Sequence, residues 1–426
     1  MKKKVFVLLV VVALIAALCA TFVACNKKGN NADDTIKLDP MTNIDNVTVD
    51  KTGGVVKSSI KFGLITLHDS SSTYDKNFID AATAVCAEMG VALVVESGID
   101  ETNECYEQAV EFAEAGYDIV FADSFGHEPF MVQAAKEYPN VQFCHATGTS
   151  GRIANVSNFQ TAFANIYEGR YLAGIAAGMK LNEMINNNTI TAAQAVMGYV
   201  GAYPYEEVVS GLTSFYLGAK SVCPQVTMKT TFTNSWFDPV AEANSATALI
   251  NAGCVLISQH ADSMGAPSTC EAAGVPNVTY NVSTKTACPN TYLAGCKINW
   301  GTYFKYIIEC VKYGKDIPDD WTGGFATGAV ETLELGSAVA DGTAAAIAAA
   351  KAQFEAGTLK VFDCSKFTVS GLTLTEYVAN VISDENFEAD TNVVLKSGNT
   401  TYIAESTYRS APYFGLTIDG ISPLNA

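Results

Sequence analysis

The stretch Val226-Thr-Met-Lys-Thr-Thr-Phe-Thr-Asn-Ser-Trp-Phe-Asp-Pro-Val240 runs from a strand-like pattern into the start of a helix. Asp238 followed by Pro239 is typical of a helix N-terminus, because a carboxylate caps free N–H groups and proline needs no N–H there. Trp236 and Phe237 are therefore predicted at the carboxyl end of a strand, where open α/β sheets bind ligands. The alternative is that Asp238 only caps and both rings only pack; we favour a ligand role for Trp236.

The same order of apolar run, polar turn and helical stretch recurs from Ser58 onward, about every 30 residues, the size of a strand–helix–strand unit. Continuous apolar runs of this kind are typical of parallel strands that are covered on both faces. Two such series predict an α/β protein with two doubly wound parallel-sheet lobes, in a chain of 426 residues that is too long for one ordinary core. The predicted strands are 60–67, 91–96, 119–122 and 141–145 in the first series, and 195–200, 226–233, 254–258 and 277–280 in the second.

The N-terminal 25 residues resemble a bacterial lipoprotein signal. A basic start, Met1-Lys-Lys-Lys4, precedes an almost entirely apolar run that ends at Cys25. We expect Cys25 to become the lipidated first residue; the alternative is an uncleaved anchor helix, since the run is just long enough to span a membrane. Either way, the globular part is expected at the cell membrane on its extracytoplasmic face, held by a flexible polar tether of residues 26–57.

Changes in composition mark the other expected parts of the chain. The polar segment Gly151–Asn158 and the segment Cys296–Trp300 are candidate crossovers between the lobes. After Gly323 the strand–helix alternation stops, so the remainder is predicted to be a C-terminal appendage that packs on the lobes. The predicted parts are lobe 1 at 58–155 with about 297–330, lobe 2 at 156–296, and the appendage at 331–426, with a helix over 343–356 and strands over 361–367 and 369–374.

Charge and composition argue against several classes of protein. A net charge of -18 disfavours binding to nucleic acid or adsorption on anionic lipid by charge. The 12 cysteines show no Cys-x-x-Cys pair and no zinc spacing, and those in apolar strand patterns, such as Cys144 and Cys254, are interpreted as small core residues. Free thiols outside the cytoplasm indicate an anaerobic source or some disulfides. With four histidines and no hydrolase or phosphate-loop motif, neither an enzyme nor a bound metal or cofactor is predicted.

Aromatic and hydrogen-bonding side chains follow the predicted strands in both series. Two lobes that face each other would bring these strand ends to one cleft, where rings can stack on a planar ligand and polar groups can fix its edge. Helix caps belong in the same turns, so a structural role is as expected as a ligand role for Asp123, Phe125 and Asp262. His145 and His260 more often satisfy a core or turn hydrogen bond than bind a ligand.

Eight motifs over about residues 58–330 resemble the basic membrane protein family of bacterial lipoproteins, which serve as substrate-binding components of ABC importers. The resemblance implies a type I periplasmic-binding-protein fold, two lobes joined by a hinge, and a permease and an ATPase as partners. It also implies a purine nucleoside or nucleobase as ligand, and the motifs at 235 and 259 are similar to an adenine-binding branch. The motifs are Phe62-Gly-Leu-Ile, Tyr74-Asp-Lys-Asn-Phe78, Phe121-Ala-Asp-Ser-Phe-Gly126, His145-Ala-Thr-Gly148, Tyr167-Glu-Gly-Arg-Tyr-Leu-Ala-Gly174, Ser235-Trp-Phe-Asp-Pro239, Gln259-His-Ala-Asp-Ser263 and Asn299-Trp-Gly301.

The same resemblance implies roles for single residues. Phe78 matches a ring that stacks on the base, and Trp236 matches the ring opposite it. In nucleoside-binding members an aspartate and a lysine hold the ribose, and those places read Asn281 and Trp300 here. A carboxylate suits two hydroxyl donors better than an amide does, so this departure favours a free base or another ligand over a nucleoside. The predicted ligand-binding residues are Tyr74, Phe78, Asp123, Ser124, Phe125, Trp236, Asp238, His260, Asp262, Asn281 and Trp300.

Other functions stay open at this point. Sugar receptors share this architecture and also stack on tryptophan, so a sugar is an alternative ligand. A nucleoside-processing enzyme at the cell surface and a sensory or adhesive lipoprotein without a permease are further alternatives.

Overall fold

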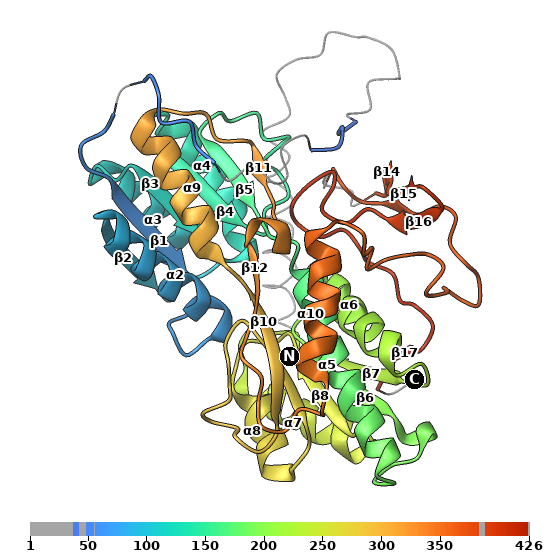
Figure 1. Ribbon diagram of the computed structural model, residues 1–426. Coiled ribbons are helices and arrows are strands. Elements are labelled where there is room, and N and C mark those ends of the chain that lie inside the picture. Colours follow the sequence, from blue (N-terminus) through green and yellow to red (C-terminus); the bar gives the residue numbers. More distant parts are fainter. Residues whose placement is uncertain (1–36, 42–47, 55, 383–387, 425–426) are drawn as a thin grey trace, which may run out of the picture. The chain divides into compact units, whose positions relative to one another are not determined.

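The strand–helix repeats fold into two β-sheets, each covered by helices on both faces (Figure 1). The computed structural model describes residues 37–41, 48–54, 56–382 and 388–424. The expected signal peptide at 1–25, with Cys25, and part of the expected tether lie outside these residues. Within the described ranges, no helix is both long enough and apolar enough to cross a bilayer.

The first sheet has the strand order β11-β5-β4-β3-β1-β2, and all neighbouring strands pair in parallel. Successive side chains of each strand point to opposite faces, so that Phe62 and Leu64 join one core and Ile65 another. The strands are β1 (Lys61–Thr66), β2 (Ala92–Ser97), β3 (Ile119–Ala122), β4 (Gln142–Ala146), β5 (Phe159–Ala162) and β11 (Asp320–Trp321). One face carries α2 (Thr73–Met89) and α9 (Trp300–Tyr313), and the other carries α3 (Asn103–Glu114) and α4 (Glu128–Glu137).

The second sheet has the strand order β12-β10-β9-β8-β6-β7-β17 and is parallel except for the β10–β12 pair. Its strands are β6 (Val196–Gly201), β7 (Thr227–Phe232), β8 (Leu256–Gln259), β9 (Asn277–Tyr280), β10 (Tyr292–Ile298), β12 (Val330–Thr332) and β17 (Ile421–Pro423). One face carries α5 (Ile166–Asn186) and α6 (Glu206–Val222), and the other carries α7 (Pro239–Asn251) and α8 (Gly265–Ala273).

Both sheets are wound in the same way. In each sheet the second strand is followed by the first, third, fourth and fifth, and β17 is added outside β7 in the second sheet. The chain therefore reverses direction between β1 and β3 and again between β6 and β8. Loops that leave the carboxyl ends of two such strands diverge and open a crevice, which is where doubly wound sheets bind ligands. The topology therefore gives each lobe one favoured place for a site.

The predicted fold class is confirmed, and each of the eight predicted strands corresponds to an observed one within a few residues. The chain crosses to the second sheet after β5, later than the 151–158 segment that was expected, because β5 pairs with β4 in the first sheet. The strands β11 and β12 were not predicted, since two or three residues are too few to show a period. The ten cysteines within the described residues are all buried and unpaired, and the interpretation of Cys144 and Cys254 as core residues is confirmed.

The C-terminal appendage contains one helix and little regular sheet. Helix α10 (Thr343–Glu355) is confirmed, whereas the strands predicted over 361–367 and 369–374 are wrong and are replaced by turns. Asp363 Oδ1 accepts a hydrogen bond from Ser365 N (2.9 Å), and Ser370 and Gly371 both have positive φ, of 51° and 78°. These residues favour turns over a continuous strand. Two short antiparallel pairs follow, β13 (Val378–Ala379) with β14 (Thr391–Asn392) and β15 (Val394–Ser397) with β16 (Thr400–Ile403).

The end of the appendage contacts both sheets. Strand β17 extends the second sheet beside β7, where Met228 N donates to Gly420 O (2.9 Å) and Leu424 N donates to Thr230 O (2.8 Å). Ten residues before Gly420, Ser410 N donates to Asp320 Oδ2 (2.7 Å) in β11 of the first sheet. The segment from 410 to 424 is therefore attached to both lobes.

Candidate ligand-binding site

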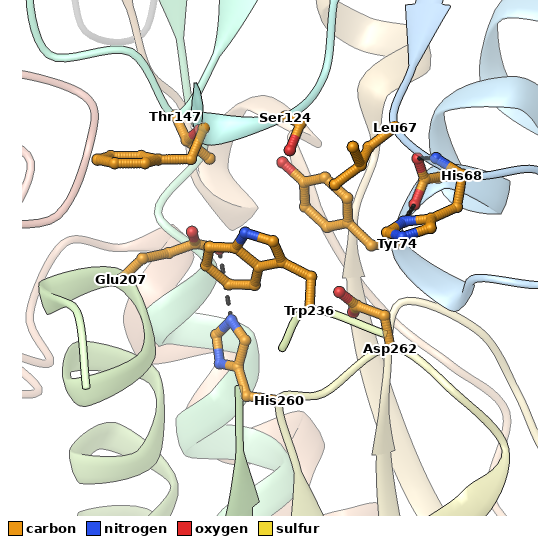
Figure 2. A pocket seen from close by; sticks show the side chains of 11 residues that line it. Leu67, His68, Tyr74, Ser124, Thr147, Glu207, Trp236, His260 and Asp262 are labelled. Atoms are coloured by element: carbon orange, nitrogen blue, oxygen red, sulfur yellow. Dashed lines mark hydrogen bonds and ion pairs between the residues drawn. The ribbon is translucent and has the colours of Figure 1, made fainter. Parts of the chain in front are cut away.

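A pocket lies where the carboxyl ends of the two sheets meet (Figure 2). Its lining residues follow β1, β3 and β4 in the first lobe and β6, β7 and β8 in the second, so that both topological switch points contribute to it. They are Leu67, His68, Tyr74, Asp75, Ser124, Phe125, Thr147, Glu207, Trp236, His260 and Asp262.

The pocket is closed in this structure. The lining side chains leave a cavity of about 20 Å³ between them. Contacts between the lobes hold it shut: Thr73 N donates to Asp262 O (2.8 Å), and the rings of Phe125 and Tyr205 stack with their centroids 5.7 Å apart. A space of that size holds about one water molecule. Entry of a larger solute therefore requires the lobes or the lining side chains to move apart.

Trp236 is held at the centre of the pocket by the turn that links β7 to α7. Asn234 has a positive φ of 56°, and Asp238 caps α7 by accepting from Val240 N (3.0 Å) and Ala241 N (2.9 Å). The rings of two tyrosines brace the half-buried indole, Tyr203 at 5.0 Å and Tyr205 at 6.0 Å between centroids. Figure 2 shows Tyr74 on one side of this indole and Glu207 on the other. Asp238 thus acts as a cap and lies outside the pocket lining.

Phe78 does not face Trp236 across an open gap, and that expectation is wrong. Its side chain is fully buried in the first lobe, stacked on Trp300 with centroids 4.4 Å apart and planes at 28°. Tyr74 lies one helical turn earlier on the same face of α2, contacts Phe78 at 4.9 Å and reaches the pocket instead. Helix α2 begins at the cleft and continues into the core of the first lobe. Only its first turn therefore borders the pocket.

Asp262 presents a carboxyl group to the pocket without a protein donor. It is 5% exposed, and no hydrogen bond from another described residue reaches its carboxyl oxygens, although its backbone N donates to Trp236 O (3.0 Å). Burial, followed by repulsion from Asp75, raises the pKa of this carboxyl well above its usual value. Asp75 is already satisfied, because its Oδ1 accepts from His68 N (2.7 Å) and Ser72 Oγ donates to its Oδ2. Asp262 is therefore the available acceptor for a ligand.

A buried polar chain supports the second-lobe side of the pocket. His260 contacts Glu207 Oε1 through Nε2 (3.4 Å) and the Tyr199 hydroxyl through Nδ1 (3.3 Å), and that hydroxyl accepts from Arg170 Nη2. Arg170 is fully buried, with the rings of Tyr199 (5.4 Å) and Tyr280 (5.0 Å) around its guanidinium. Burial lowers the pKa of His260, against the opposing effect of Glu207. The imidazole is thus held in place as part of the pocket wall.

Six of the predicted ligand-binding residues line the pocket: Tyr74, Ser124, Phe125, Trp236, His260 and Asp262. Asp123 lies just behind it, where its Oδ1 accepts from Leu67 N (3.3 Å) and its carbonyl accepts from the Tyr74 hydroxyl (2.9 Å). Asn281 and Trp300 instead border a separate open groove that shares no lining residue with the pocket. Trp300 is 1% exposed, because its indole fills the core beside Phe78.

Five lining residues were not predicted: Leu67, His68, Asp75, Thr147 and Glu207. Leu67 and His68 directly follow β1, and Thr147 directly follows β4. Their positions at the ends of strands could have identified them as lining residues. Asp75 and Glu207 lie in the first turns of α2 and α6. A carboxylate at such a position usually caps the helix or interacts with the helix dipole. Among the described residues, no three His, Cys, Asp or Glu side chains are arranged to hold a metal ion.

Comparison with known proteins places these features in a family. The profile of the Bmp family, described as ABC transporter substrate-binding protein PnrA-like, matches residues 64–350. TsgA13 of Haloferax volcanii, named as an ABC transporter glucose-binding protein, is 34% identical over 60% of this chain and 62% of its own length. A purine-binding protein of Brucella abortus is 36% identical over 45% of this chain and 51% of its own. The chain thus covers less than two thirds of either relative.

Solved structures agree on the fold. An ABC transporter solute-binding protein from Conexibacter woesei matches with a TM-score of 0.59 and 17% identity, over 71% of this chain and 98% of its own. One from Aeropyrum pernix matches with a TM-score of 0.60 and 14% identity, over 74% and 94%. At these identities the match shows the fold alone. Since the family profile spans more than half of the sequence, the chain belongs to the PnrA-like family of ABC transporter substrate-binding proteins.

Proposed function

We propose that this chain is the extracytoplasmic receptor of an ABC importer and that it captures a small planar solute, a purine base or nucleoside, in the Trp236 pocket. One observation carries the proposal: Trp236 and Tyr74, from different lobes, line the same pocket as the unpartnered carboxyl of Asp262. Aromatic rings hold a flat ligand by its faces, and a carboxylate holds it by its edge.

The polar groups of the pocket favour a ligand that donates hydrogen bonds. Asp75, Asp262 and Glu207 all contribute carboxyl groups, while the lining contains no lysine or arginine. A purine carries N–H donors on the edge of a flat ring, so it can satisfy Asp262 and stack on Trp236 at the same time. A carboxylate or phosphate ligand would meet like charge in the same space.

The two relatives are named for different ligands, one for purine and one for glucose. Rings contributed by both lobes can stack on both faces of a flat ligand, which favours the purine. Sugar binding is the second candidate, and it rests on the similarity to TsgA13. In either case, hinge closure around the solute would present both lobes to a permease and its ATPase, with lipid on Cys25 holding the receptor at the membrane.

A thermal-shift panel of purine bases, nucleosides, sugars and amino acids tests the proposed ligand class. A ligand that binds only the folded state stabilises it by about 2.7 kcal/mol at a hundredfold excess over Kd, so a purine should raise the melting temperature. A shift with sugars and none with purines would reverse the assignment. A nucleoside converted to base and sugar on prolonged incubation would instead indicate an enzyme.

Changing Trp236 to alanine should weaken purine binding by about 1–3 kcal/mol, the range for loss of one aromatic stacking partner. Trp236→Phe is the matched control, because it keeps a ring in the same place and should retain most of the affinity. The measurement is isothermal titration calorimetry with a purine that is positive in the panel. An alanine variant with the affinity of the original chain would show that the indole only packs.

A further inference from the structure

The C-terminal appendage is anchored to the second lobe by a strand and by buried rings. Strand β17 lengthens the second sheet beside β7. Two buried rings of the appendage contact α5: Phe354 lies 5.8 Å from Tyr171, and Phe362 lies 5.6 Å from Tyr167, between ring centroids. Separating paired strands or buried aromatic rings costs stability. This side of the appendage therefore moves as part of the second lobe.

The first lobe holds the same appendage at a short latch segment that runs from Tyr408 to Ser410. Ser410 N donates to Asp320 Oδ2 in β11 (2.7 Å), and Arg152 Nη1 donates to Tyr408 O (2.5 Å). Arg152 lies in the loop between β4 and β5, and its Nη1 also donates to Asp39 O (2.8 Å). Such hydrogen bonds can break and re-form without opening a hydrophobic core.

The latch segment has little slack. Arg409 ties it to the rest of the appendage, because its buried guanidinium donates through Nη1 to Val381 O (2.9 Å). Phe414, four positions after Ser410, is fully buried and stacks on Phe362 with the ring centroids 4.4 Å apart. Four residues span at most about 14 Å when fully extended. A rotation that carries the first lobe away from the second therefore breaks the latch bonds, since the chain between the two attachments cannot lengthen by much.

The latch segment lies at the flank of the cleft between the lobes. Arg409 and Pro412 border a space whose other walls include Thr149 of the first lobe and Glu206 of the second. Thr149 lies in the loop after β4, and Glu206 lies in the first turn of α6, so both belong to the ends of the lobes that face each other. The distance between the lobes at this flank changes when the cleft opens.

We infer that the appendage is a latch between the lobes: residues 408–410 hold the first lobe while the receptor is closed and release it when the receptor opens. This latch rests on the proposed function in one respect, that the receptor opens and closes around its solute. It stabilises the closed state, so the solute stays bound longer than it would between lobes without the latch. Residues 408–410 lie beyond residue 350, the last that the family profile matches.

Hydrogen exchange of the full-length chain, measured without ligand, tests the latch. Thr73 N, in the first residue of α2, donates to Asp262 O of the other lobe (2.8 Å), so the exchange rate of this amide reports opening of the lobes. Arg152→Ala removes the donor to Tyr408 O. We expect it to raise the exchange rate of the Thr73 amide by about tenfold, the scale of one lost hydrogen bond to a charged group. Amides of the buried strand β3 should keep their exchange rates, which shows that the variant is folded.

Two control variants accompany Arg152→Ala. Arg152→Lys keeps a cationic donor at the same place and should restore most of the protection of the Thr73 amide. Lys136→Ala removes one positive charge from an exposed position in α4 of the same lobe, and it should leave the Thr73 amide as protected as in the original chain.

Three results would overturn the latch. Faster exchange within residues 408–410 of Arg152→Ala, with none at Thr73, would show that Arg152 only packs the appendage in place. Unchanged exchange at both places would show that the bond to Tyr408 holds nothing closed. A Thr73 amide that exchanges without protection in the original chain would show that the lobes open freely. Because no ligand is present, failure of the purine assignment would leave this test unaffected.

Discussion

Replacing Trp300 by alanine should lower the free energy of unfolding by about 3–5 kcal/mol, the cost of truncating a large aromatic side chain in a core. The indole is 1% exposed and lies between Phe78 (4.4 Å) and Phe304 (6.2 Å). Its removal leaves a cavity that rings on the neighbouring elements cannot fill without moving. Chemical denaturation followed by circular dichroism measures the loss, and calorimetry on the folded variant should show purine affinity close to that of the original chain.

Trp236→Ala is the matched control for Trp300→Ala, because both remove an indole from the same chain. Trp236 is half-buried at the pocket, so its loss should cost less stability and more affinity than the loss of Trp300. The pair therefore separates packing from ligand contact. If Trp300→Ala kept its stability and lost its ligand, Trp300 would return to the binding role that the family resemblance implies.

Glu405→Gln should stabilise the protein at pH 8 by about 3 kcal/mol relative to the original chain, and by little at pH 4. Glu405 is 5% exposed; its Oε1 accepts from Tyr413 N (3.3 Å) and Phe414 N (3.4 Å). Burial raises the pKa of this carboxyl from 4.5 to about 7. A shift of that size corresponds to about 3 kcal/mol at 1.36 kcal/mol per unit.

The sign follows from proton binding in the two states. Between pH 4.5 and 7 the folded state keeps a proton on Glu405 that the unfolded chain has lost, so raising the pH favours unfolding. The stability contributed by the protonated carboxyl is complete below pH 4.5 and is lost as the pH rises through 7. Glutamine is neutral at every pH, so the variant does not lose this stability as the pH rises. Chemical denaturation of both chains at several pH values measures their free energies of unfolding. If the difference between the two chains were the same at pH 4 and pH 8, Glu405 would not titrate in this range.

The fold was predictable from local patterns where the elements are long and regular. An apolar run such as 119–122 identifies a strand, and the Asp238-Pro239 pair identifies the start of a helix, without tertiary information. The turn that holds Trp236 lies at such a strand–helix junction. Strand β17 was not predictable in the same way, because it pairs with β7 about 190 residues earlier in the chain. Nothing within Ile421–Pro423 specifies that partner.

The sequence predicts which strand ends border the pocket, but it does not predict which side chains at those ends point into it. Tyr74 and Phe78 have the spacing of one helical face, and the sequence does not show which of the two turns borders the cleft and which enters the core. Trp300 follows the strand β10, yet packing against Phe78 turns it inward. Arg409 and Glu206 border the same space although they lie far apart in the chain, and such a long-range meeting leaves no local signal.

The emission of Trp236 gives the most direct test of the central claim, that a purine stacks on this indole. The chain has three tryptophans, and the other two, Trp300 and Trp321, are 1% and 2% exposed. Titration with a purine should change the tryptophan fluorescence of the original chain saturably, and Trp236→Phe should lose that change while calorimetry still detects binding. A fluorescence change that persists in Trp236→Phe, or no saturable change with any purine, would contradict the account.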